Sequence, residues 1–130
     1  MIPITILLIT ADDSMASAIE TSLTESGFKV LRSTRGVGAL ELIQAEKPAM
    51  LVLDVELPDF NSMAIIRTLR SADGQDHLPV ILIGINLREE DALLGLEVGA
   101  DLCLRETFHP QVFVARVRSL LRRSELAKIV

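Results

Sequence analysis

The clearest signal in this chain is the stretch Met50-Leu51-Val52-Leu53-Asp54-Val55-Glu56-Leu57-Pro58. An unbroken apolar run that is rich in Val and Leu predicts a β-strand buried on both faces. Pro58 lacks a backbone N–H and disfavours helix in the residue before it, so the strand must end by that point. Asp54 directly follows the apolar run and is therefore expected at the carboxyl end of the strand. In open α/β sheets, ligands and chemistry collect at this edge.

Composition points to a single globular domain. The chain has 130 residues, of which 49% are hydrophobic and 24% charged, and its net charge is −5. This acidic balance argues against direct nucleic-acid binding, which favours a basic face. No apolar stretch approaches the roughly 18 residues of a membrane span, and the first residues lack the pattern of a secretory signal. Cys103 is the single cysteine, which excludes an internal disulfide and fits a cytoplasmic protein.

Apolar runs and helical patterns alternate along the whole chain. The apolar runs lie at residues 4–9, 28–31, 50–53, 80–85 and 101–104, and a helical pattern follows each of them. Such alternation predicts repeated βαβ units, hence a parallel sheet with helices on both faces. Asp13 or Ser14 is expected to cap the first helix, and Gly27 to end it.

These patterns predict one α/β domain over residues 1–124 and a C-terminal tail over residues 125–130. The last helical pattern loses its apolar spacing after Glu125. Two interpretations of the tail stay open. It either closes the domain or begins a linker to an output domain.

Four segments resemble, in order, the receiver domain of two-component response regulators. They are residues 54–60, 78–83, 95–101 and 114–123. The resemblance implies a CheY-like, doubly wound sheet of five parallel strands in the order 2-1-3-4-5. It also implies that Asp54 is the phosphoacceptor for a histidine kinase or phosphotransfer protein, with no enzyme activity beyond this self-catalysed transfer.

Phosphoryl transfer to a carboxylate requires charge neutralisation, usually by Mg²⁺ held on carboxylates. The resemblance implies that Mg²⁺ would be bound by Asp54, by the backbone carbonyl of Glu56 and by acidic residues after the first strand. Asp12 is the first candidate among these acids, and Asp13 is a further one.

The position of this acidic pair has two interpretations. An alignment without gaps, counted back from Gly27, places Thr10 and Ala11 at the family's acidic positions. Asp12 and Asp13 would then open the first helix, where negative charge interacts favourably with the helix dipole. A two-residue bulge in the loop would instead bring Asp12 and Asp13 to the metal site.

Three further positions depart from the family pattern and make the chain an atypical receiver. Gly84 stands where the family has Thr or Ser, Cys103 where it has an aromatic residue, and Glu106 where it has Lys. Strand alternation points Arg105 to the opposite face, so it is not expected to replace the lysine. Without these groups, phosphorylation of Asp54 is expected to be weak, slow or absent.

Two functions follow from this pattern. The first is a receiver in a phosphorelay that controls an output or partner through the face formed by its fourth helix, fifth strand and fifth helix. Glu97, Asp101, Arg116 and Arg123 are candidates for ion pairs across a homodimer, although solvated charges would look the same. The output would be a DNA-binding or diguanylate cyclase domain.

The second function is a phosphate-independent pseudo-receiver that acts as a protein–protein interaction module. A third class, a hydrolase with Asp54 as its nucleophile, is disfavoured because no second acid–base residue or cation is positioned by the sequence.

Overall fold

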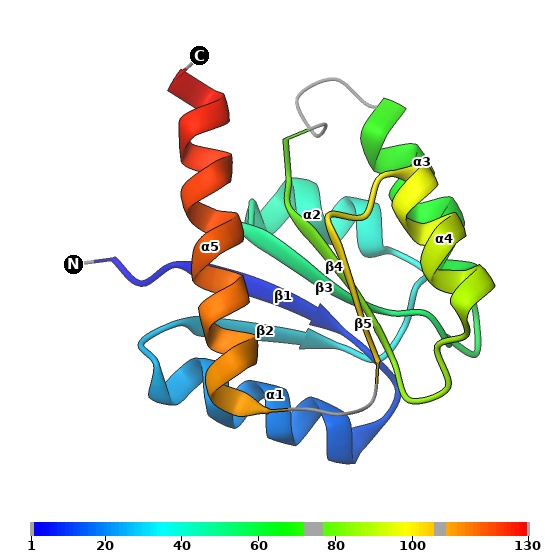
Figure 1. Cartoon of the computed structure of the whole chain (residues 1–130), viewed down its shortest axis with the longest axis horizontal. Coiled ribbons are helices and arrows are strands. Elements are labelled where there is room, and N and C mark those ends of the chain that lie inside the picture. The colour runs from blue at the N-terminus through cyan, green and yellow to red at the C-terminus, as the bar shows by residue number, and fades with distance from the viewer. Residues whose placement is uncertain (1, 72–76, 106–108, 130) are drawn as a thin grey trace.

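A computed structural model of the chain describes residues 2–71, 77–105 and 109–129 (Figure 1). Across these residues, five strands alternate with five helices, as the sequence predicts. The strands are β1 (Thr5–Ile9), β2 (Lys29–Ser33), β3 (Met50–Asp54), β4 (Val80–Gly84) and β5 (Leu102–Arg105). The helices are α1 (Asp13–Glu25), α2 (Ala39–Glu46), α3 (Ser62–Ser71), α4 (Glu89–Val98) and α5 (Pro110–Ile129).

The strands form one parallel sheet in the order β2-β1-β3-β4-β5. Helices α1 and α5 cover one face, and α2, α3 and α4 cover the other (Figure 1). This arrangement confirms the predicted doubly wound α/β fold. Asp54 pairs with Ile83 of β4, so the carboxyl ends of β3 and β4 lie side by side.

Strand β3 lies at the centre of the sheet, and all five of its residues are buried. Leu51 and Leu53 pack in the cluster under α2, α3 and α4, whereas Met50 and Val52 pack under α1 and α5. A strand between two helix layers needs apolar side chains on both faces, which explains its continuous hydrophobic run.

The first helix begins one residue earlier than the sequence suggested. Asp12 is the N-cap, and its carboxylate accepts a hydrogen bond from the Met15 N–H at 2.9 Å. The expectation that Asp13 or Ser14 caps α1 was therefore wrong. Asp and Ser both cap helices well, and the extended backbone of Asp12 makes it the residue used. Gly27, with φ of +94°, follows the C-cap and ends the helix as predicted.

Helix α5 runs without a break through Ile129. Residues 125–129, expected to form a tail, are therefore helical, and the domain boundary at residue 124 stays a prediction. Within the described ranges, none of the helices combines the length and apolar character needed to cross a bilayer.

Arg70 fastens the end of α3 to its neighbours. Its guanidinium donates to the carbonyl of Gly99 after α4, to that of Leu78 before β4, and to the carboxylate of Asp101 at 3.1 Å. The same Asp101 carboxylate accepts the N–H of Val80 at 2.8 Å. One half-buried cation thus ties α3, α4 and β4 together.

Candidate functional site

Asp54 stands at the carboxyl end of β3, where the sequence placed it. Its side chain is 5% exposed, and both carboxylate oxygens accept hydrogen bonds. The Thr10 hydroxyl donates to Oδ2 at 2.6 Å, and the Glu56 N–H donates to Oδ1 at 2.9 Å. The Ser62 hydroxyl fixes the backbone by donating to the Asp54 carbonyl at 2.5 Å. The carboxylate is therefore held by β1, by the loop after β3 and by the start of α3.

Burial raises the pKa of Asp54 above its ordinary value, because desolvation disfavours the charged form. The hydrogen bonds from Thr10 and Glu56 act in the opposite direction, since they stabilise the carboxylate. The negative charges of Glu56 and Asp12 add to the upward shift of the pKa. The site thus gathers carboxylates around Asp54.

Thr10 follows β1 directly and is buried, whereas Ala11 is exposed. This register corresponds to the alignment without gaps, in which Thr10 and Ala11 stand where the family has its acidic pair. The sequence identified Thr10 only as a position without an acid, and it missed the hydroxyl's role as a hydrogen-bond donor to Asp54.

Asp12 and Asp13 have different surroundings. Asp12 caps α1, yet it also lines a cleft of about 240 Å³ together with Ala11, Met15, Asp54, Glu56 and Ile85. Asp13 is exposed and lies 3.6 Å from Arg32 on β2. Among the residues that the structure describes, no group of three or more His, Cys, Asp or Glu side chains is arranged to hold a metal ion.

The residues present do not fit a bound Mg²⁺ as they are arranged. Mg²⁺ demands near-octahedral oxygen ligation and is held in proteins through carboxylates. Here a neutral hydroxyl occupies Oδ2 of Asp54, and one oxygen of Asp12 is used to cap a helix. Asp12, Asp54 and Glu56 are the candidates that the structure brings to one cleft, and Asp13 lies apart from them.

Gly84 ends β4 beside Asp54 and is tightly enclosed. A Cβ atom at this position would lie 2.6 Å from Cγ1 of Val55 and 3.3 Å from Cβ of Leu87. The packing of the neighbouring loop is therefore matched to glycine, and a switch hydroxyl would require Val55 to move.

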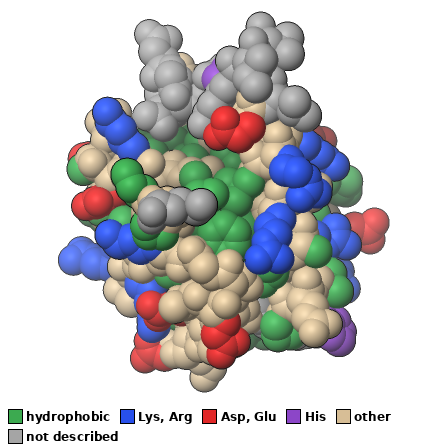
Figure 2. Space-filling model, turned by 90° about the vertical axis from the view of Figure 1, so that its left-hand side faces the viewer, with side chains coloured by type: hydrophobic (Ala, Val, Ile, Leu, Met, Phe, Trp, Pro, Cys, Tyr) green, Lys and Arg blue, Asp and Glu red, His purple; other side chains and the backbone are tan. Residues whose placement is uncertain are grey.

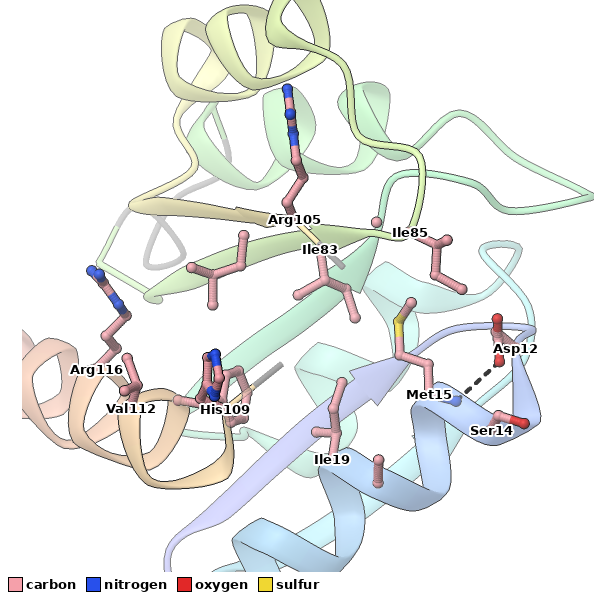
Figure 3. A pocket seen from close by; sticks show the side chains of 14 residues that line it. Asp12, Ser14, Met15, Ile19, Ile83, Ile85, Arg105, His109, Val112 and Arg116 are labelled. Atoms are coloured by element: carbon pink, nitrogen blue, oxygen red, sulfur yellow. Dashed lines mark hydrogen bonds between the residues drawn. The ribbon is translucent and has the colours of Figure 1, made fainter. Parts of the chain in front are cut away.

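The end of β5 carries the other positions that the sequence predicted to depart from the family pattern. Arg105 extends toward α4, away from Met15 and Asp12, in line with the predicted strand alternation (Figure 3). Cys103 is half-buried, with its Sγ 3.6 Å from the Ala92 carbonyl, and burial raises the pKa of its thiol. Glu106 lies outside the described residues.

The four interface candidates do not share one environment. Glu97, Arg116 and Arg123 are exposed, whereas Asp101 is already engaged by Arg70 and by a backbone N–H of β4. Figure 2 shows Lys and Arg side chains gathered on the side of the molecule where α5 lies. Helix α5 contributes four exposed cations, namely Arg116, Arg118, Arg122 and Arg123.

The parallel sheet order 2-1-3-4-5 is the doubly wound arrangement that flavodoxin and CheY share. Residues 6–118 match the family model described as response regulator receiver domain. The chain therefore belongs to the receiver domain family of two-component response regulators. Such domains act with histidine kinases, generally bind Mg²⁺ for phosphorylation, and are not enzymes in the ordinary sense.

Comparison with individual proteins supports this assignment. Transcriptional regulatory protein GltR of Pseudomonas aeruginosa is 33% identical over 124 residues, which cover 95% of this chain and 51% of that protein. Transcriptional regulatory protein AfsQ1 of Streptomyces coelicolor is 37% identical over 120 residues, which cover 92% of this chain and 52% of that protein. The chain thus spans about half the length of the curated relatives it matches.

Solved structures show the same likeness. The BeF3-activated N-terminal receiver domain of RstA from Klebsiella pneumoniae has a TM-score of 0.81 and 31% identity, covering 91% of this chain and 98% of that one. The receiver domain of Francisella response regulator 1452 has a TM-score of 0.81 and 26% identity, covering 92% of this chain and 98% of that one.

Proposed function

We propose that this receiver domain signals through protein contacts that do not depend on phosphorylation of Asp54. The observation that carries the proposal is the 2.6 Å hydrogen bond from Thr10 to Asp54. Thr10 stands where receivers have a metal-binding acid, and its hydroxyl satisfies the oxygen that would otherwise be free to react or to bind a cation.

The electrostatics of the cleft support this proposal. A carboxylate attacking a phosphoryl group needs the charges of both partners neutralised. Here Glu56 and Asp12 add negative charge near Asp54, and Gly84 has no hydroxyl to bind a phosphoryl oxygen. An incoming phosphoryl group would meet a like-charged cleft without Mg²⁺ to offset the repulsion.

The proposed contact surface is the α4-β5-α5 face. Helix α4 exposes Leu93, Leu94 and Leu96, and α5 exposes the four arginines. Exposed apolar side chains and arginines are both typical of protein interfaces. Such a face suits a homodimer, a partner protein or an output domain.

Because the relatives are transcriptional regulators about twice as long, a DNA-binding output is favoured over a diguanylate cyclase. A cytoplasmic location stays a prediction.

The second candidate function is a phosphorelay receiver with Asp54 as its phosphoacceptor. It is favoured by the cleft that Asp12, Asp54 and Glu56 share, since these groups could be drawn together by a divalent cation. In this case the Thr10 hydroxyl would have to leave Asp54 before the metal binds.

Fluoroberyllate, a phosphoryl mimic, separates the two functions. The ¹⁵N-labelled chain is titrated with Mg²⁺ and fluoroberyllate, with the RstA receiver, known in a BeF3-activated form, as a positive control. We expect no saturating shift at the amides of Asp54 and Glu56 at millimolar metal. A saturating, Mg²⁺-dependent response that Asp54→Asn abolishes would overturn the proposal and establish the phosphorelay function.

A further inference from the structure

A pocket of about 300 Å³ opens between α1 and α5, over the carboxyl ends of β4 and β5 (Figure 3). Its walls are mostly apolar and come from elements far apart in the sequence. The apolar lining includes Met15, Ile19, Ile83, Ile85, Val112 and Phe113. Ile85 and Val112 are 44% and 53% exposed, so the apolar surface is open to solvent. Concave apolar sites of this size with a few polar groups are typical of small-molecule binding.

The polar groups of the pocket are distributed unevenly. His109, directly before α5, and Arg116 on α5 line the same end (Figure 3). Within the described part of the chain, the side chains of both residues lack ion-pair and hydrogen-bond partners. At the opposite end lies the negatively charged Asp12, one oxygen of which accepts the Met15 N–H. The α5 end therefore offers donors and a positive charge that are free for a ligand.

We propose that this pocket binds a small organic anion with an apolar body. The acidic group of the ligand lies against Arg116 and His109, and its hydrocarbon portion fills the space between α1 and β4. An inorganic anion would leave the apolar walls without contact, and a neutral hydrocarbon would gain nothing from the cation at the α5 end. This ligand site goes beyond the proposed protein-contact function.

The pocket adjoins the cleft of Asp54. Asp12, Met15 and Ile85 line both spaces, so a ligand in the pocket touches side chains that border Asp54. Binding would therefore change the surroundings of the Thr10–Asp54 pair without any phosphoryl group. The site is a means of input for a receiver that does not rely on phosphate.

The test uses 4-phenylbutyrate as the probe and the neutral 4-phenylbutanamide for comparison. Both are titrated into the ¹⁵N-labelled chain and followed by NMR. Arg116→Ala is compared with Arg118→Ala, since Arg118 is an exposed arginine of the same helix that does not line the pocket. Val112→Gln is compared with Leu93→Gln, because Leu93 is a similarly exposed apolar residue on α4.

We expect saturating shifts at Met15, Ile83 and Phe113, with smaller shifts at Thr10. Arg116→Ala should weaken phenylbutyrate binding about tenfold and leave the amide unaffected, because one charge-assisted hydrogen bond is lost. Val112→Gln should weaken binding of both compounds. Equal effects of Arg116→Ala and Arg118→Ala, or shifts spread over α4, would overturn the proposal. Concentration-dependent shifts of the same residues without probe would overturn it in favour of a second copy as occupant.

Discussion

Replacing Thr10 with valine tests the hydrogen bond on which the proposed function rests. Valine keeps the shape of the side chain and removes the hydroxyl that donates to Asp54 at 2.6 Å. Thr10 is 2% exposed and Asp54 5%, so water has little access to the vacated oxygen. A hydrogen bond to a charged group contributes about 1.5–3 kcal/mol. The same hydroxyl also accepts the Asp12 N–H at 3.1 Å, a neutral bond that contributes about 0.5–1.5 kcal/mol.

We therefore expect Thr10→Val to lower the free energy of unfolding at pH 7 by about 2–4 kcal/mol. This change in the free energy of unfolding is measured by urea unfolding, with circular dichroism as the signal. Thr68→Val is the matched control, since the Thr68 hydroxyl is exposed and bonds only to the Ala64 carbonyl within α3. Its effect should stay within about 0.5 kcal/mol.

The pH dependence of this difference identifies the acceptor. The Thr10 hydrogen bond lowers the pKa of Asp54, so its contribution is present while Asp54 is ionised and is lost as pH falls through the titration of Asp54. Burial raises this pKa above 3.8. As pH falls, the difference in the free energy of unfolding between wild type and Thr10→Val should therefore begin to narrow while the pH is still above 3.8. A loss no larger than that of Thr68→Val, or one independent of pH, would refute the reasoning.

Three further substitutions test the surroundings of the site by urea unfolding. Because the pKa of Asp54 is raised, ionisation of this carboxyl lowers the free energy of unfolding as pH rises above 3.8. Asp54→Asn should therefore raise the free energy of unfolding at pH 7 and lose this advantage at pH 3. An equal change in the free energy of unfolding at the two pH values would contradict burial of the charge. Gly84→Thr should lower the free energy of unfolding by about 1–3 kcal/mol, because the new side chain clashes with Val55. Adding Val55→Ala should restore much of this loss, and no restoration would show that the clash is absent. Arg70→Ala should lower the free energy of unfolding by about 2–4 kcal/mol, because charged hydrogen bonds are lost. Arg67→Ala, at an exposed position of the same helix, should change it little. Similar losses in the two variants would exclude a role for Arg70 in holding α3, α4 and β4 together.

The fold could be predicted because its signals are local and repeat along the chain. The run from Met50 to Leu53 has no polar interruption, as a strand between two helix layers requires. The first helix cap was misassigned because Asp12, Asp13 and Ser14 are all good capping residues in succession. Choosing among them depends on where the backbone leaves the extended conformation, and the side chains carry no information on that point.

The candidate site could be predicted only in part. The position of Asp54 follows from the end of its own strand, so sequence pattern was sufficient to place it. Thr10, which donates to Asp54, is 44 residues away and directly follows β1, so the contact depends on the exact register of the loop after that strand. The alignment without gaps indicated that Thr10 takes an acidic position, but a missing acid does not reveal a new hydrogen bond. The apolar pocket was not predicted, because its walls come from α1, β4, β5 and α5.

Thr10 accounts for two features of this site at once. An acid at this position would repel Asp54 unless a cation lay between them, so a receiver with an acidic pair is adapted to bind metal. A threonine needs no cation, because its hydroxyl donates directly to the carboxylate and offsets part of the cost of burying it. The same substitution thus removes a metal ligand and stabilises Asp54 in the absence of metal. Asp54 then serves as an acceptor that links Thr10, directly after β1, to the loop after β3.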